Sequence, residues 1–241
     1  MPRKKLPAGY YEWTPELAYA VGLIVIDGNL SGDGRHIILR SKDIEQIKNS
    51  KKCLRLKNKI GSTKKTLSNG STATCYRVQF GNVQFYRWLE LLGLTPAKTY
   101  SIPRLPVPDL YFRDFLRGHL DGDGTITTYT DVYNIKKNAA YRYVRLFLCF
   151  LSASEPHLRW VQETVQRLIG IKGDFWKRVS KDVKRVDMWQ LKYMKKDSRI
   201  LIPWLYYAKD LPCLQRKREK AERALIKIES VRRKKYTRVS Q

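Results

Sequence analysis

The chain has 241 residues, with 48 Lys and Arg against 22 Asp and Glu, so its formal net charge is +26. Apolar residues make up 43% of the chain, enough for one large or two small domains, but no apolar run reaches the length of a membrane span or signal peptide. A positive field of this strength favours nucleic acid as the partner and argues against a membrane surface, which would require an amphipathic basic helix or a lipid anchor.

The first predicted element is an apolar helix over residues 17–26 that ends at Asp27-Gly28. Gly22 lies in the middle of this helix, where glycine costs about 1 kcal/mol relative to alanine and therefore needs a packing reason. Ala18 lies one turn earlier on the same side of the helix. We expect a second backbone to approach this side closely.

Two hairpins and two helices are predicted between this run and a proline-rich segment. The turns come from glycine-containing clusters, and the strands from alternating apolar residues. Asp43 is expected to cap the first of the two helices. The predicted elements are a hairpin over 29–41 turning at 31–34, a helix over 43–59, a hairpin turning at 68–70 with a return strand at 74–80, and a helix over 82–92.

The segment 96–109 contains four prolines and is predicted to be an extended linker. It separates an N-terminal half, residues 1–95, from a C-terminal half, residues 110–241. The C-terminal half repeats the order of elements. Its predicted elements are an apolar helix ending at Asp123-Gly124, strands at 125–133 and 140–151, a helix over 155–169 capped by Ser154, strands at 174–179 and 186–195, a helix after Asp197, and a basic helix within 211–241.

The two halves are interpreted as an internal duplication. When Gly22 is aligned with Gly118, the two Asp-Gly pairs also align, and Asp27 and Asp123 lie 123 − 27 = 96 residues apart. Each half then has the order αββαββα, and the loops account for the remaining differences in length. Two units are too few for a solenoid, so a pseudo-twofold α+β protein is predicted.

If the two glycine-containing helices pack together, Asp27 and Asp123 become neighbours at two helix C-termini. Two carboxylates in this position repel each other and the helix dipoles, and a divalent cation relieves both effects. Oxygen ligands favour Mg²⁺ over zinc, and the carbonyl groups of Ile26 and Gly122 would complete the set. Alternatively, each Asp-Gly pair is only a helix stop followed by a turn. A calcium loop at Asp121 fails because the sixth position is Ile126 and the twelfth is Val132.

The remaining metal-binding and redox residues are scattered. The three histidines, His36, His119 and His157, are too few and too far apart for a zinc site, and His119 is interpreted as a packed helix residue. The four cysteines have no paired spacing and are expected to be reduced thiols of an intracellular protein. They are Cys53, Cys75, Cys149 and Cys213.

The two runs resemble the paired motifs of single-chain LAGLIDADG homing endonucleases. The second copy, Leu-Arg-Gly-His-Leu-Asp-Gly-Asp-Gly, is a close match, and the first, Ala-Val-Gly-Leu-Ile-Val-Ile-Asp-Gly, is looser. The penultimate acid, which is catalytic in the family, is kept as Asp27 and Asp123, whereas Val25 replaces an acid common in the family. The resemblance implies two pseudo-symmetric halves whose antiparallel sheets form a DNA-binding saddle, with the motif helices packed at the interface.

The resemblance also implies an activity. Such a protein is a monomer that hydrolyses one phosphodiester on each strand of a long asymmetric DNA target, with Mg²⁺, for which Mn²⁺ can substitute. Intron encoding is expected rather than an intein, because the terminal splicing residues are absent. Lys217 follows a segment similar to the one that delivers an active-site lysine in the family, and Lys98 is its counterpart in the first half. Either lysine could instead contact phosphate.

Exposed faces of the predicted strands supply the expected DNA contacts. One face of each strand is apolar and the other carries side chains suited to the edges of bases in a major groove, although most antiparallel sheets also have a solvated face. The expected contacts are Asn29, Arg35, Arg40, Lys42, Arg77 and Gln79 in the first half and Tyr141, Tyr143, Arg145, Gln190 and Lys192 in the second.

Two other functions remain open. A protein of the same fold that does not cut DNA, either an intron RNA-splicing maturase or a DNA-binding regulator, would share the charge and the paired helices. A general RNA- or ribosome-associated basic protein would share only the charge. Both motif acids are present, which favours the endonuclease.

Overall fold

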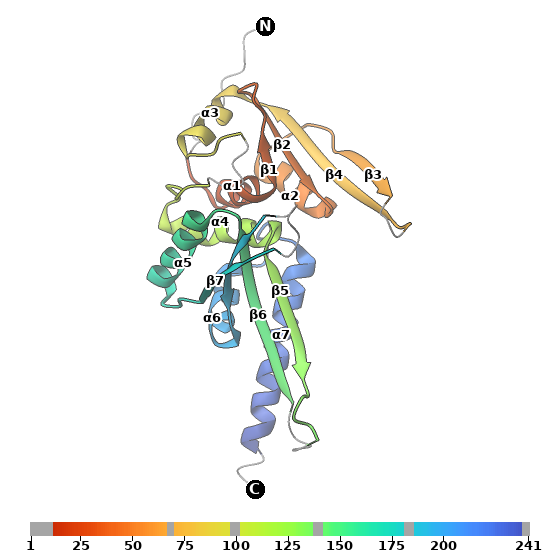
Figure 1. The fold of residues 1–241 in the computed structure, drawn as a ribbon, viewed down its shortest axis with the longest axis vertical. Helices are drawn as coiled ribbons and strands as arrows, with labels where there is room; N and C mark the ends of the chain where they lie inside the picture. Colours follow the sequence, from red (N-terminus) through yellow and green to blue (C-terminus); the bar gives the residue numbers. More distant parts are fainter. Residues whose placement is uncertain (1–11, 67–69, 97–101, 137–141, 181–185, 238–241) are drawn as a thin grey trace.

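The computed structural model describes residues 12–66, 70–96, 102–136, 142–180 and 186–237, with the side chains of 65 and 232–237 left out. The protein is α+β and consists of two αββαββα halves followed by a long helix (Figure 1). This order confirms the predicted duplication. The first half contains α1 (Pro15–Asp27), β1 (Gly28–Leu30), β2 (His36–Ser41), α2 (Ile44–Cys53), β3 (Gly61–Thr66), β4 (Thr72–Gly81) and α3 (Val83–Leu91).

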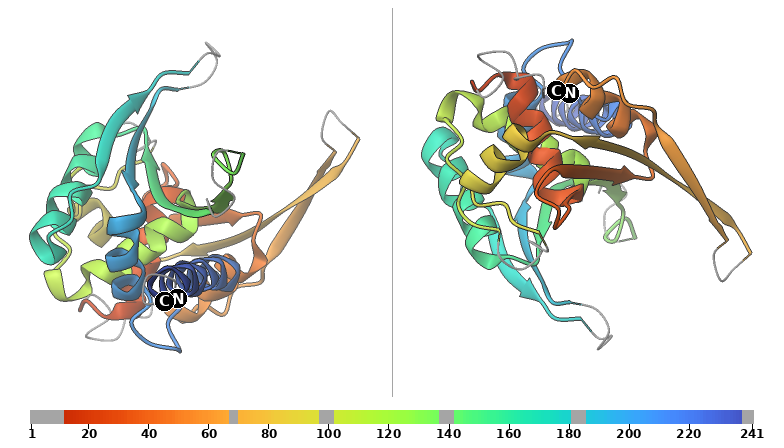
Figure 2. Two further views of the ribbon diagram at one scale, coloured as in Figure 1. Left: turned by 90° about the horizontal axis from the view of Figure 1, so that it is seen from below. Right: turned by 90° about the horizontal axis from the view of Figure 1, so that it is seen from above.

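The second half repeats this arrangement. Each half has a four-stranded antiparallel sheet, with the strand orders β1-β2-β4-β3 and β5-β6-β8-β7. A final helix runs alongside β5 and β6, and the outer hairpins of the two sheets extend away from the central helices (Figures 1 and 2). The elements are α4 (Asp109–Gly122), β5 (Thr125–Asp131), β6 (Tyr143–Ser152), α5 (Glu155–Ile169), β7 (Asp174–Arg178), β8 (Met188–Tyr193), α6 (Lys195–Leu205) and α7 (Gln215–Thr237).

The helices α1 and α4 pack directly against each other at the junction of the two halves (Figure 1). A Cβ atom on Gly22 would lie 2.2 Å from the carbonyl oxygen of Phe115 and 3.1 Å from the Cα of Gly118. A Cβ atom on Gly118 would lie 2.1 Å from the carbonyl oxygen of Tyr19. Neither position can hold a side chain without separating the helices, which confirms the predicted reason for both glycines.

Two helix boundaries and two predicted capping interactions differ from the sequence predictions. The helix α2 ends at Cys53 and not near Lys59, because Arg55 adopts a left-handed conformation with φ +51°. Asp43 and Ser154 occupy the N-cap positions of α2 and α5 but make no side-chain capping hydrogen bond. The Ser154 hydroxyl instead donates to the Ile102 carbonyl, at 2.7 Å. The helix α6 begins at Lys195, two residues before Asp197.

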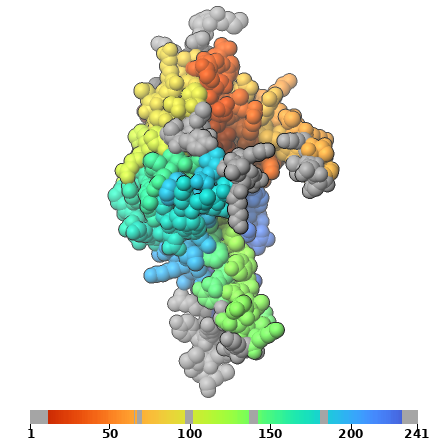
Figure 3. Space-filling model, viewed as in Figure 1, coloured from red at the N-terminus to blue at the C-terminus, as the bar shows by residue number. Residues whose placement is uncertain are grey.

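The last helix, α7, docks on the second half as predicted. Its own residues Ala221, Ala224 and Ile228 are buried against the second half, whereas most of its charged residues other than Lys217 are not buried. A space-filling view shows the two halves as adjoining lobes (Figure 3). Within the described ranges no helix has the length and apolar character to cross a bilayer, and all four cysteines are free.

Two buried histidines stack in the core of the second half. The rings of His119 and His157 are nearly parallel, with centroids 5.4 Å apart, and Phe150 packs edge-on against His119. His157 Nδ1 lies 3.2 Å from the Pro103 carbonyl, whereas both ring nitrogens of His119 lack a hydrogen-bond partner among the described residues. Burial lowers the pKa of His157 to about 4 and lowers the pKa of His119 well below its ordinary value.

This pair predicts a loss of stability in mild acid. Because the folded protein holds both rings neutral, only the unfolded chain takes up their protons, so the stabilisation is complete above about pH 6.5 and falls as pH decreases toward 4. Each such proton contributes a slope of about 1.4 kcal/mol per pH unit. His119→Leu, which introduces the residue found at the equivalent Leu23, should flatten this slope in urea unfolding between pH 7 and 5.

Asp121 is a buried acid whose pKa is raised, so it changes stability with pH in the opposite direction. It is present in both the wild type and His119→Leu, and its effect therefore cancels when their slopes are compared. Equal slopes for the wild type and His119→Leu would show that His119 is not held neutral in the folded state.

Candidate functional site

The C-terminal ends of α1 and α4 meet, which brings the two motif acids to one place. Asp27 is the last residue of α1, and Asp123 directly follows Gly122, the last residue of α4. A Cβ atom on Gly122 would lie 3.1 Å from Asp27 Oδ2, so the Asp27 carboxylate lies against the residue that precedes Asp123. The glycine gives the carboxylate room to approach the end of the partner helix.

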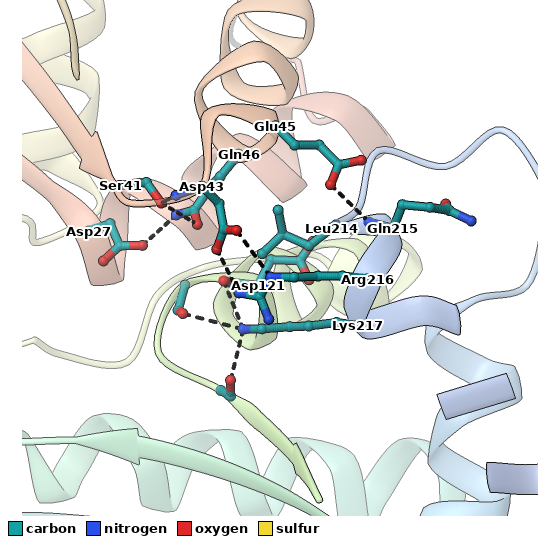
Figure 4. Close-up of polar contacts among 12 residues, drawn as sticks. Asp27, Ser41, Asp43, Glu45, Gln46, Asp121, Leu214, Gln215, Arg216 and Lys217 are labelled. Atoms are coloured by element: carbon teal, nitrogen blue, oxygen red, sulfur yellow. Dashed lines mark hydrogen bonds and ion pairs between the residues drawn. The ribbon is translucent and has the colours of Figure 1, made fainter. Parts of the chain in front are cut away.

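Asp27 is held by a glutamine that the sequence analysis missed. The Gln46 side-chain amide donates to Asp27 Oδ2, and Gln46 Oε1 accepts a 3.0 Å hydrogen bond from the Ser41 hydroxyl (Figure 4). Gln46 is buried, so its amide needs partners. Its position in the first turn of α2, beside the buried Ile47, is the only signal of this role in the sequence.

Asp123 lies beside a hollow of about 110 Å³ between the two halves, whose lining includes Asn29 from β1 and Met188 from β8. Its side chain is accessible to solvent, but the surrounding protein withdraws enough water to raise the pKa of its carboxyl. The nearby charge of Lys217 opposes this shift. The carboxyl group of Asp123 is therefore partly desolvated but still reachable from solvent.

Lys217 is buried, 6% exposed, and caps the C-terminal end of α4. Its Nζ donates to the carbonyls of Leu120, Asp121 and Gly124 at 2.6, 2.9 and 2.8 Å, and the Gly122 carbonyl lies at 3.4 Å (Figure 4). The carbonyls of Leu120, Asp121 and Gly122 belong to the last turn of α4, where they carry the negative end of the helix dipole and have no partner within the helix. Burial lowers the pKa of Lys217 to about 8, and the charge of Asp121 opposes that shift.

The three short contacts use all three N–H donors of the ammonium group. Lys217 therefore holds the backbone that carries Asp123, a role that the sequence analysis did not predict. Lys98, the expected counterpart, lies outside the described residues.

Asp121 joins α1, α4 and the segment before α7. Its Oδ2 accepts hydrogen bonds from the Tyr19 hydroxyl at 2.9 Å and from the Leu214 backbone N–H at 2.7 Å. Burial raises the pKa of Asp121 to about 6, and Lys217 opposes this shift. The equivalent residue of the first motif is Val25, which is buried among apolar residues. The departure from the motif at Val25 thus removes a structural contact and leaves Asp27 in place.

A short segment, residues 213–217, links the second half to α2 and is called the C-terminal clasp. Asn49 Nδ2 donates to the Cys213 carbonyl at 2.7 Å, and Arg216 donates to both carboxylate oxygens of Asp43 at 3.1 and 2.6 Å. The Gln215 N–H donates to Glu45 (Figure 4). The clasp therefore fixes Lys217 relative to both halves.

The strand registers bring most of the predicted DNA contacts onto two sheet faces. Asn29, Arg40, Arg77 and Gln79 share the face of the first sheet opposite its buried core. Tyr143, Arg145, Gln190 and Lys192 share the corresponding face of the second sheet. We call these the open faces. Arg35 and Lys42 flank β2 at its two ends, and Tyr141 lies outside the described residues.

Two basic side chains of the second open face, Arg145 and Lys192, already contact neighbouring side chains. Arg145 donates to Asp131 Oδ2 from Nε at 2.9 Å and from Nη2 at 2.7 Å. The ammonium of Lys192 lies 4.0 Å from the centre of the Phe147 ring. Both contacts reduce the freedom of these side chains to reach a ligand.

Comparison with known proteins gives no matching protein-family model and no matching curated protein. Solved structures do match over nearly the whole chain. The homing endonuclease I-WcaI bound to its DNA recognition sequence has a TM-score of 0.56 at 14% identity, covering 92% of this chain and 94% of that chain. The I-LtrWI LAGLIDADG homing endonuclease bound to target DNA has a TM-score of 0.54 at 14% identity, covering 91% of each chain.

A third solved structure has the same fold but is not named as an endonuclease. Full-length DUF199/WhiA from Thermatoga maritima has a TM-score of 0.52 at 14% identity, covering 93% of this chain and 63% of that chain. At 14% sequence identity, these matches show that the folds are similar and nothing more. The chain therefore has the fold of the single-chain LAGLIDADG homing endonucleases, with both motif helices at its centre.

Proposed function

We propose that this protein is a site-specific, metal-dependent double-strand DNA endonuclease. The observation that supports the proposal is the meeting of Asp27 and Asp123 at two helix ends, each on the half that carries its own open face. Two acids at one place and two DNA-binding faces suit one cut in each strand. The positive charge of +26 supplies the attraction for the phosphate backbone.

The donors near the two acids fit Mg²⁺. They are carboxylate and carbonyl oxygens, and the described residues contain no cluster of three or more His, Cys, Asp or Glu that could hold a metal by itself. Mg²⁺ keeps several waters and is commonly bound by one or two carboxylates together with substrate phosphates. Asp27 and Asp123 would hold it, with the Ile26 and Gly122 carbonyls nearby; Mn²⁺ could substitute. When bound, the metal lowers the pKa of a water and neutralises charge at the phosphate.

The protein's own groups provide the positioning. Gln46 orients the Asp27 carboxylate, and Lys217 holds the turn that carries Asp123. The charge of Lys217, near both acids, would also stabilise the negative charge that develops on the phosphate. The open faces bind the duplex on either side of the acids, so that the two scissile phosphates come to the same place.

The second candidate is a DNA-binding regulator of the same fold that does not cut. This candidate is considered because DUF199/WhiA matches the chain with a TM-score of 0.52, close to the 0.56 of the endonuclease I-WcaI. A binding protein, however, has no need for two acids at the joined helix ends, where they repel each other. The presence of both Asp27 and Asp123 therefore favours the endonuclease.

The first test uses the two acids. Duplexes bound in Ca²⁺ are selected from a random library, and their cleavage is then followed in Mg²⁺ with each strand end-labelled separately. Asp27→Asn and Asp123→Asn keep the side-chain size but remove a charge that holds the cation. Cleavage should fall by orders of magnitude for either variant, while affinity without metal changes little.

Cleavage of both strands at the wild-type rate by either variant would contradict the proposed site. Selective binding by the wild type with no cleavage in Mg²⁺ or Mn²⁺ would favour the DNA-binding regulator.

The second test concerns Lys217. Lys217→Met keeps the length and apolar stem but leaves the α4 carbonyls without their donor, so the variant should lose about 1–3 kcal/mol of stability in urea unfolding. Its cleavage rate should also fall more than its DNA affinity. Lys220→Met, on the exposed side of α7, is the matched control and should affect only affinity and its salt dependence. Equal effects from the two variants would reduce Lys217 to a phosphate contact.

A further inference from the structure

Two arginines face each other on the open face of the first sheet. Arg40 of β2 pairs directly with Arg77 of β4 in the antiparallel register, and both side chains are exposed. Directly opposite side chains on one sheet face have Cβ atoms about 4.5–5.5 Å apart. The neighbouring pair along the same two strands is Ile38 with Gln79, which adds an exposed amide next to the arginines.

This arrangement is unfavourable in the protein alone. Like charges directly opposite each other in a sheet are destabilising. Within the described part of the chain, neither Arg40 nor Arg77 has a carboxylate partner or a side-chain hydrogen bond. The second sheet differs, because Arg145 is held by Asp131 through two hydrogen bonds. The first sheet thus presents two guanidinium groups whose donors are free for a ligand.

The backbone around Arg77 accommodates its side chain. Gly61 of β3 pairs with Arg77, and a Cβ atom on Gly61 would lie 3.2 Å from Arg77 Nε and 3.4 Å from its Cγ. The arginine stem therefore lies across the space left by the glycine. This contact limits the directions in which the guanidinium group can point, which favours directional hydrogen bonding over loose attraction to phosphate.

We propose that Arg40 and Arg77 read guanine bases, so that the half-site bound by the first sheet contains G·C pairs at neighbouring positions. The inference rests on the proposed DNA binding and deepens it. Arginine donates two parallel hydrogen bonds to guanine O6 and N7 in the major groove, which admits a two-stranded β-ribbon. Guanine also supplies the acceptors that relieve the repulsion between the two guanidinium groups. Arg145, already occupied by Asp131, contributes little to base choice.

The test is the base preference of single variants. Wild type, Arg40→Gln, Arg77→Gln and the matched control Arg87→Gln, at an exposed arginine of α3 away from the open faces, are each used to select duplexes from a random library in EDTA, where cleavage is absent. The wild type should prefer G at two neighbouring positions by about 5- to 150-fold. Because glutamine pairs with adenine N6 and N7, each of the first two variants should shift one of these positions from G toward A. Arg87→Gln should leave the selected sequence nearly unchanged.

A uniform loss of affinity in Arg40→Gln and Arg77→Gln, with unchanged base preference and a salt slope smaller by about one, would identify phosphate contacts and overturn the inference. No sequence preference in the wild type would overturn it as well. Selective binding with the predicted shifts but no cleavage in Mg²⁺ would leave this inference standing while the proposed endonuclease fails. The thermal stability of both variants, without DNA, should equal or exceed that of the wild type, because the repulsion between the two arginines is removed.

Discussion

The close backbone contact between α1 and α4 is the constraint on which the rest of the structure depends. It requires glycine at positions 22 and 118, because a Cβ atom at either would lie about 2 Å from a carbonyl oxygen of the partner helix. The contact buries both helices and joins the halves across their centre. It also sets the two helix C-termini side by side, so that Asp27 lies against Gly122 and next to the turn that carries Asp123. Packing and candidate chemistry therefore share one cause.

The C-terminal ends of α1 and α4 are stabilised by different side chains, although the two halves have the same fold. In the first half Gln46, three residues after the N-cap of α2, reaches Asp27. The equivalent residue in the second half, three after Ser154, is His157, which stacks on His119 in the core and does not reach Asp123. Lys217 holds that end instead. The duplicated fold thus supports two unequal acids, and the C-terminal clasp supplies what the second half lacks.

Much of this architecture follows from local patterns. The glycine-containing apolar runs, the turn clusters and the alternating strands predict the order αββαββα and the close approach at Gly22, because each depends on residues near in sequence. The hydrogen bond from Gln46 to Asp27 and the capping of α4 by Lys217 were not predicted. The first joins residues 19 positions apart in the sequence, and the second joins residues 93 to 97 positions apart. The early end of α2 depends on one left-handed residue, Arg55, which has no distinctive sequence signal.

The central claim, that Asp27 and Asp123 hold divalent metal at one shared site, is tested most directly by anomalous scattering from Mn²⁺. The measurement needs crystals of the protein with a selected duplex, soaked in manganese. We expect the anomalous signal within about 2–2.3 Å of carboxylate oxygens from both Asp27 and Asp123, beside the scissile phosphates. Manganese bound to only one of the two acids, or only elsewhere on the protein, would contradict the account.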